Sequence, residues 1–175
     1  MYKNVQIKGA DLEIERKFTV KRLPQDLDRY PCRIIEQAYL NTDPVVRVRR
    51  QDDEYYMTYK GKGLLAREEY NLPLNEPSYY HLREKADGNV ISKKRYVIPI
   101  TDPTFASDYT KDIDQISLYV ELDIFDAPFA PLIIAEVEFP SEETANAFIP
   151  LDWFDQDVTH DPAYHNSNMS KKVFN

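Results

Sequence analysis

The chain has 175 residues and a net charge of −8, and 42% of its residues are hydrophobic while 30% are charged. This composition is typical of a globular protein with a substantial core, and no apolar run approaches the roughly 20 residues that a membrane-spanning helix needs. The negative charge argues against broad binding to nucleic acid, because a basic face supplies most of that affinity.

Eight segments have the side-chain alternation and composition of β-strands, and turn residues lie between them. In chain order the segments are 12–20, 33–41, 45–51, 54–61, 66–74, 90–100, 117–125 and 132–140. Strands at such short spacing predict an antiparallel barrel.

Helical patterns are fewer and shorter. One helix is expected from about Ser78 to Ala86, with Ser78 as its N-cap and Gly88 just past its end. Another is expected to begin near Ser141, because two acidic residues follow it. Short helical turns are expected near 24–30 and after Asp161. The predicted fold is therefore mainly β, an eight-stranded antiparallel barrel with a few flanking helices.

The first strand segment contains LEIERKF, in which charged residues occupy every second position. Glu13, Glu15 and Lys17 therefore share one face of the strand. Paired polar groups at the same spacing recur in six of the other strand segments, and segment 33–41 places Gln37 and Tyr39 on such a face. For any one strand a solvated outer face would explain the pattern, but that explanation weakens when all the strands are considered together.

If the strands close into a barrel, the apolar residues fall on the outer face and the charged rows point inward. The acids of the inner face are then Glu13, Glu15, Glu69, Glu121, Asp123, Glu136 and Glu138. The bases are Lys17, Arg47, Arg49, Lys60, Arg67, Lys93 and Arg95. Such an interior is unfavourable unless it holds water, metal ions and a charged ligand. Carboxylates suit Mg²⁺ or Mn²⁺, and Arg and Lys suit phosphate, so the pattern predicts a site for a metal-bound polyanion.

The same residues resemble the motifs of a known family. EIERK at 13–17 fits the ExExK signature of the CYTH superfamily, also called triphosphate tunnel metalloenzymes. Further motifs follow in the family's order: QAYL at 37–40, VRVR at 46–49, TYKG at 58–61, RxE at 67–69, KxRY at 93–96, ELD at 121–123, AEVEF at 135–139 and DVT…NSN at 157–168. The resemblance runs from about Asp11 to Lys171 and implies a barrel that is open as a tunnel.

The resemblance also implies roles for the inward residues. The main metal-binding carboxylates would be Glu13, Glu15, Glu136 and Glu138, and a second metal or its waters would be held by Glu69, Glu121 and Asp123. The phosphate clamp would consist of Lys17, Arg47, Arg49, Lys93 and Arg95, together with Arg67. Lys60 is similar to a family lysine that is paired with a tyrosine, here Tyr39, and these two are the catalytic candidates. Two positions depart from the family: Ala38 often corresponds to glycine, and Asn71 in many members to a carboxylate.

By resemblance, the expected activity is hydrolysis of tripolyphosphate, with release of a terminal phosphate and dependence on Mg²⁺ or Mn²⁺, with two ions expected in the site. The alternatives are a class IV adenylate cyclase, a thiamine triphosphatase or a nucleoside triphosphatase, and a non-catalytic polyphosphate sensor. Retention of four metal-type carboxylates favours an enzyme over a sensor. No aromatic-rich loop with amide side chains stands beside the clamp motifs, which favours a bare phosphate chain over a nucleotide.

Other features set expectations about location and partners. The single cysteine, Cys32, excludes an internal disulfide framework, and the first residues lack the apolar core of a signal peptide, so a cytoplasmic protein is expected. We find no repeat or linker, which predicts one domain over residues 1–175. The expected partner is a small phosphate compound, with no nucleic acid or membrane, and a homodimer stays open. His81, His160 and His165 share no metal-ligand spacing, so a surface or structural role is expected for each.

Overall fold

The structure is a computed structural model that describes residues 11–62, 65–110 and 116–174, without the side chains of residues 11, 12, 66 and 67. Nine strands occur in these ranges. They are β1 (Asp11–Val20), β2 (Cys32–Thr42), β3 (Val45–Gln51), β4 (Glu54–Lys60), β5 (Ala66–Pro73), β6 (Asp87–Ile100), β7 (Leu118–Phe125), β8 (Ile133–Glu138) and β9 (Phe154–Asp157). The first eight overlap the eight predicted segments, with ends that differ by up to three residues, and β9 is an addition.

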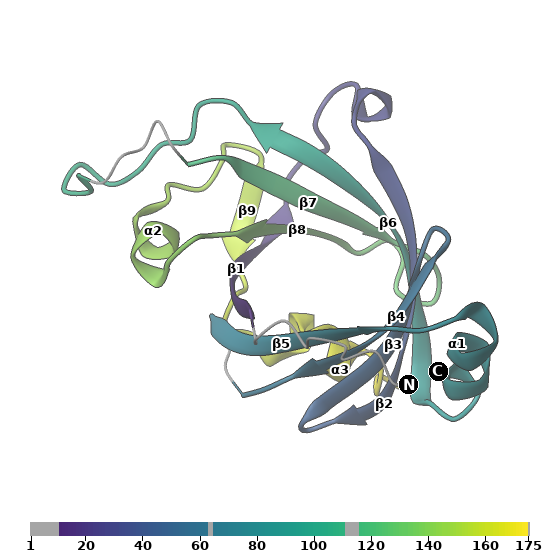
Figure 1. The fold of residues 1–175 in the computed structure, drawn as a ribbon. Coiled ribbons are helices and arrows are strands. Elements are labelled where there is room, and N and C mark those ends of the chain that lie inside the picture. Colours follow the sequence, from purple (N-terminus) through teal and green to yellow (C-terminus); the bar gives the residue numbers. More distant parts are fainter. Residues whose placement is uncertain (1–10, 63–64, 111–115, 175) are drawn as a thin grey trace.

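All strand pairs are antiparallel, and the strands form one sheet in the order β5-β4-β3-β2-β6-β7-β8-β1-β9. The sheet curls around a central space (Figure 1). β1 also pairs with β5, from Asp11 opposite Glu69 to Ile14 opposite Ala66, and this short seam joins the two ends of the series from β5 to β1. The prediction of a mainly β, antiparallel tunnel with few helices is confirmed.

The sheet register places the charged rows on the inner face. Lys17 lies opposite Glu136, and Arg95 lies opposite Asp123. Directly opposed residues in an antiparallel pair point to the same face, so these rows meet inside the barrel. The alternate residues of β1, among them Ile14 and Phe18, are buried in an outer cluster.

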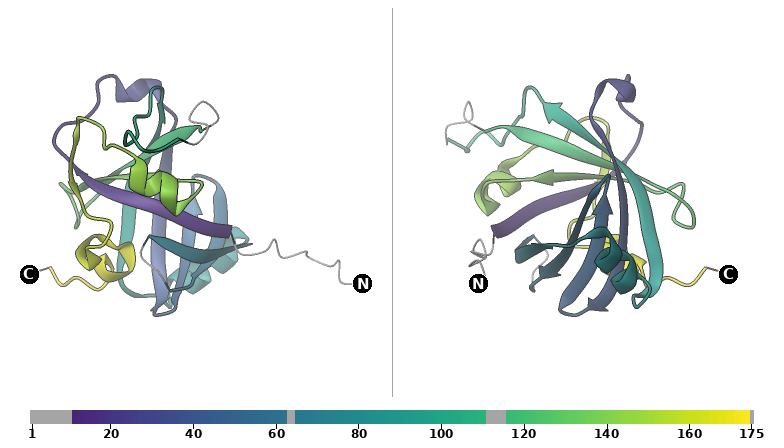
Figure 2. Two further views of the ribbon diagram at one scale, coloured as in Figure 1. Left: turned by 90° about the vertical axis from the view of Figure 1, so that its left-hand side faces the viewer. Right: turned by 45° about the vertical axis from the view of Figure 1, so that its right-hand side comes forward.

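Two helices cover parts of the outer face (Figure 2). α2 (Glu142–Ala147) covers β1, and its N-cap is Ser141 as predicted, because the Ser141 hydroxyl accepts a hydrogen bond from the Thr144 amide. α1 (Glu76–Arg83) packs on β2 and β3 through the fully buried Tyr79. The predicted cap of α1 was wrong, because Asn75 is the N-cap and accepts from the Ser78 amide.

The C-terminal segment lies at one end of the barrel. It contains the 3-10 turn η3 (Pro162–Tyr164) and α3 (Asn166–Met169), in the region where Asp161 predicted a helical turn. Met169 is buried with Tyr39, Phe125 and Ile134, which come from the ends of three strands. The segment therefore covers the end of the tunnel at which β2 finishes.

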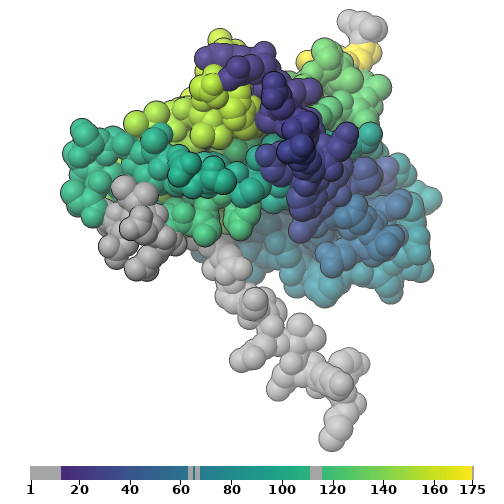
Figure 3. Space-filling model, turned by 90° about the horizontal axis from the view of Figure 1, so that it is seen from above, coloured from purple at the N-terminus to yellow at the C-terminus, as the bar shows by residue number. Residues whose placement is uncertain are grey.

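The connection between β1 and β2 carries the 3-10 turn η1 (Leu27–Arg29) within the range predicted for a turn. Seen from above, this connection lies across the top of the molecule (Figure 3). None of the helices in the described ranges combines the length and the apolar character needed to cross a membrane.

Candidate active site

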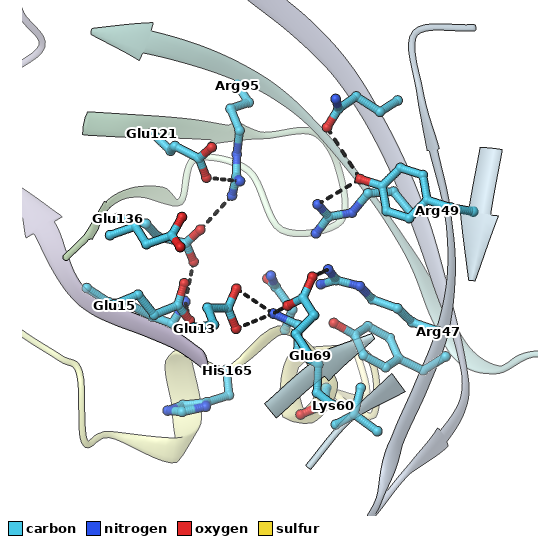
Figure 4. Close-up of a pocket in the computed structure, with 18 of the residues that line it drawn as sticks. Glu13, Glu15, Arg47, Arg49, Lys60, Glu69, Arg95, Glu121, Glu136 and His165 are labelled. Atoms are coloured by element: carbon cyan, nitrogen blue, oxygen red, sulfur yellow. Dashed lines mark hydrogen bonds and ion pairs between the residues drawn. The ribbon is translucent and has the colours of Figure 1, made fainter. Parts of the chain in front are cut away.

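A polar cavity of about 270 Å³ occupies the interior of the barrel. Its walls come from all eight strands of the barrel, and the C-terminal segment contributes His165, Asn166 and Ser167. Figure 4 shows acids from β1, β7 and β8 on one side and the arginines of β3 on the other. The cavity therefore has an acidic side and a basic side.

Lys17 lies among the acids of β1 and β8. Its ammonium group is 2.8 Å from Glu15 and also contacts Glu136. Burial opposes ionisation of the Glu136 carboxyl, but Lys17 and Arg95 hold the pKa of Glu136 well below its usual range. Lys17 thus balances part of the acidic side.

Lys60 joins β4 to the acids of β1 and β5. Its Nζ lies 2.6 Å from the Glu13 carboxylate and 2.5 Å from that of Glu69. Burial alone would raise the pKa of Glu69, but Lys60 and then Arg47 lower it to about 2. Tyr39, the predicted partner of Lys60, also lines the cavity, and its hydroxyl lies 3.4 Å from the Gln37 amide nitrogen.

The two arginines of β3 differ in how they are held. The Arg49 guanidinium donates two hydrogen bonds to the Gln37 amide oxygen, at 3.0 and 2.8 Å. Arg47 is only 5% exposed, and its Nη2 is 4.0 Å from Glu69. Arg47 Nε has no hydrogen-bond partner in the part of the chain that the structure describes. Arg47 is thus a buried cation with unused donor capacity that faces the cavity.

Arg95 lines the cavity, and its guanidinium is positioned by the buried carboxylate of Asp123. Asp123 accepts hydrogen bonds from its Nε and Nη2, both at 2.6 Å, and Glu121 and Glu136 contact the same guanidinium. Asp123 also contacts Lys93, and both side chains are fully buried. Burial lowers the pKa of Lys93 to about 8 although Asp123 opposes the change. Lys93 and Asp123 are not among the described residues that line the cavity, so both lie behind its wall.

Glu138 lies at the rim, opposite Glu15 in the sheet. Removal of part of its surrounding water raises its pKa, and the carboxylates of Glu13, Glu121 and Glu15 raise the pKa further. Within the described residues, no three His, Cys, Asp or Glu side chains form a group that is ready to hold a metal ion. Most of the acids point at lysine and arginine instead.

The structure brings nearly all of the predicted site residues to one cavity. Those that line it are Glu13, Glu15, Lys17, Tyr39, Arg47, Arg49, Lys60, Glu69, Arg95, Glu121, Glu136 and Glu138. Lys93 and Asp123 are adjacent but buried. Arg67 lies in β5 opposite Glu13, and its side chain is outside the described residues.

Several cavity residues were missed from sequence. His165 is buried and its Nε2 is 3.2 Å from the Thr159 carbonyl oxygen, which agrees with the expected structural role, but it also faces the cavity. The DVT…NSN motif was the available signal for this segment. Arg33 and Gln51 also line the cavity. Gln51 lies two residues beyond the predicted inner residue Arg49, so extension of the alternation in that strand could have found it. Arg33 lies four residues before Gln37, the nearest inner position predicted in its strand.

Comparisons with known proteins show the family to which the chain belongs. The family model described as CYTH domain matches residues 11–144. The chain is 36% identical over 165 residues to the inorganic triphosphatase of Nitrosomonas europaea, which covers 92% of this chain and 98% of that protein. It is also 32% identical over 172 residues to the inorganic triphosphatase of Acetivibrio thermocellus. That match covers 93% of this chain and 95% of the relative. The crystal structure of the inorganic triphosphatase NE1496 has a TM-score of 0.65 and 32% identity, with 92% of this chain and 95% of that chain covered.

Proposed function

Because this chain belongs to the CYTH domain family, we propose that it is a metal-dependent inorganic triphosphatase that releases a terminal phosphate from tripolyphosphate. The observation that carries the proposal is the unsatisfied hydrogen-bonding capacity of the buried Arg47 side chain. It is buried against the cavity, its Nε lacks a hydrogen-bond partner among the described residues, and its nearest ion-pair contact is 4.0 Å away. A buried donor of this kind is unfavourable unless an anion completes its hydrogen bonds.

The basic side is suited to hold a phosphate chain from several directions. Arg47, Arg49 and Arg95 come from two different strands, and the guanidinium group of arginine can bind phosphate oxygens with two parallel hydrogen bonds. Asp123 and Gln37 fix the orientation of Arg95 and Arg49 before a ligand arrives. Such prior positioning favours a chain that is held in line for attack.

The acidic side fits divalent metal in its chemistry. Glu138 lies among acids that raise its pKa, and a cation would relieve this repulsion. Glu13, Glu15, Glu136 and Glu138 would hold the ions, with Glu69 and Glu121 beside them, and carboxylate oxygens are the ligands that Mg²⁺ and Mn²⁺ prefer. A bound divalent ion supplies charge neutralisation at phosphate and a lower pKa for bound water. Glu13 and Glu69 would have to release Lys60 in part to act there.

Lys60 and Tyr39 are the proposed groups for proton handling. The Lys60 ammonium is placed by Glu13 and Glu69, and the Tyr39 hydroxyl is placed beside Gln37. From these positions either group can donate a hydrogen bond to the attacking water or to the oxygen of the leaving pyrophosphate.

The free, exposed thiol of Cys32 supports the further proposal of a cytoplasmic location.

A second candidate, hydrolysis of a nucleoside triphosphate, is favoured by one observation. A hollow of about 590 Å³ is lined by Tyr55, Asn71 and Leu74, and it shares Gln51 and Tyr56 with the tunnel cavity. The sequence suggested no such combination of aromatic and amide groups beside the clamp. The hollow could take an organic group that is attached to the phosphate chain.

Phosphate release from four compounds separates the candidates. Tripolyphosphate, pyrophosphate, ATP and thiamine triphosphate are each assayed with Mg²⁺ and with Mn²⁺. We expect the highest kcat/KM on tripolyphosphate. An equal or higher value on ATP would favour the second candidate, and cyclic AMP among the products would favour a cyclase.

A further inference from the structure

Arg33 extends the basic side of the cavity beyond the proposed clamp. It lies near the start of β2, and its side chain is exposed while still lining the cavity. Gln37, which holds Arg49, lies four residues further along the same strand, a distance of about 13 Å along an extended chain. Arg33 is therefore at the end of the tunnel opposite the C-terminal segment.

The register places Arg33 against another cation. Arg33 is directly opposite Arg95 in the antiparallel pair of β2 and β6. Like charges in this arrangement repel and destabilise the sheet. An anion bound between the two guanidinium groups would relieve this repulsion, which points to a role for Arg33 in binding an anion.

The two arginines differ in their partners. Arg95 contacts Asp123, Glu121 and Glu136. The Arg33 side chain makes no hydrogen bond and no ion pair with the described part of the chain. The Arg33 guanidinium is thus available to bind an anion that is held in the neighbouring cavity.

We propose that Arg33 forms a rim subsite for an additional phosphate group. Linear polyphosphates longer than tripolyphosphate would then make one more ionic contact with the tunnel than tripolyphosphate does. The subsite deepens the proposed function and rests on it. The clamp would hold the inner phosphates, and Arg33 would bind a phosphate that extends toward solvent. A chain of three phosphates held by the clamp would not need this contact, whereas a chain of four would gain it.

The test compares two probes, tripolyphosphate and tetrapolyphosphate, on the full chain. Binding is measured by calorimetry without divalent metal, and turnover is measured with Mg²⁺. The variants are Arg33→Ala and Arg33→Lys, and the matched control is Arg22→Ala, which removes an exposed arginine that is paired with Asp152. The charge change is equal in Arg33→Ala and the control, so a general electrostatic effect appears in both.

We expect Arg33→Ala to weaken tetrapolyphosphate binding about tenfold and tripolyphosphate binding less than about twofold, as for one charge-assisted contact that is partly open to water. Arg33→Lys should restore part of the loss, because it keeps the charge but not the planar fork. An equal loss for both probes, no loss for either, or the same loss in Arg22→Ala would overturn the proposal. If the wild-type protein hydrolyses neither probe, the triphosphatase function fails, and the binding comparison still decides the role of Arg33.

Discussion

Glu138 differs from the other acids of the tunnel in having no basic partner within the described residues. Glu15 and Glu136 contact Lys17, and Glu13 and Glu69 contact Lys60. The neighbours that affect Glu138 are acids, and they raise its pKa. Removal of its charge therefore breaks no ion pair, which makes it the cleanest position at which to test metal binding.

We expect Glu138→Gln to abolish most metal-dependent hydrolysis of tripolyphosphate, by at least about 100-fold, because a proposed metal ligand is lost while its volume is kept. The melting temperature of the metal-free variant should rise slightly at neutral pH, since repulsion among acids falls. Glu68→Gln, an exposed position that neighbours Glu69 in β5, is the control and should change neither quantity. Full turnover in Glu138→Gln would remove Glu138 from the metal site.

The same residue predicts a pH dependence of stability. A carboxyl whose pKa is raised in the folded state favours folding when protonated, and this contribution disappears as the pH rises through the raised pKa. The stability advantage of metal-free Glu138→Gln should therefore be largest at neutral pH and shrink as the pH falls through that pKa, which lies above 4.5. Thermal unfolding of both proteins over a pH series measures the difference. A gap that is independent of pH would contradict the raised pKa.

Asp123 provides a contrasting case, because it is buried with two cations. We expect Asp123→Asn to lower the free energy of unfolding by about 3–5 kcal/mol, since Lys93 would be left in the core without its carboxylate. Tripolyphosphate binding should also weaken, because Arg95 loses the group that orients it. Urea unfolding is compared with that of Asp126→Asn, an exposed position just after β7. Equal stability of the two variants would contradict the assigned role of Asp123.

At the scale of elements, the C-terminal segment is fixed to the start of β6. The Asn89 amide nitrogen donates to the Ser170 carbonyl at 2.6 Å, and its side chain donates to Ser170 and Lys172. Gly88 has a φ of 72°, and a Cβ there would lie 2.3 Å from the Ser170 carbonyl oxygen. Only glycine allows this close approach without a shift of the segment.

We expect Gly88→Ala to destabilise the fold by about 1–3 kcal/mol and to raise the KM for tripolyphosphate, because the segment that carries His165 would move. Gly61→Ala is the control, since a Cβ at that position meets its nearest atom at an ordinary 3.6 Å. Unfolding midpoints and KM values are compared for the two variants. Similar behaviour of both would show that the contact between Gly88 and Ser170 is unimportant.

The elements that sequence predicted well are those with a strong local pattern. The alternation in the eight long segments identified β1 to β8, and Ser141 with its two following acids identified α2. β9 has four residues and depends on distant pairing with β1, so local pattern carried little signal for it. The cap of α1 was misplaced because Asn75 and Ser78 are both good cap residues, and Pro77 between them is compatible with the first turn.

At the scale of the whole molecule, the direction of the charged rows was predictable because β-strand alternation repeats in many segments at once. The internal pairing was not, since sequence does not show that Lys93 and Asp123 neutralise each other behind the cavity wall. Arg33 and His165 were missed for the same reason. Their positions at the cavity depend on tertiary arrangement, namely the register of β2 against β6 and the docking of the C-terminal segment.

The division of the tunnel into an acidic and a basic side leads to the central claim, that the molecule hydrolyses a metal-bound tripolyphosphate. The most direct test is phosphorus NMR of the products formed from tripolyphosphate, with Mg²⁺ and after chelation by EDTA. With Mg²⁺ we predict equal amounts of phosphate and pyrophosphate, as expected for attack of water on a terminal phosphorus, and with EDTA no products. Absence of products with Mg²⁺ and Mn²⁺, or an unchanged rate after chelation, would contradict the claim.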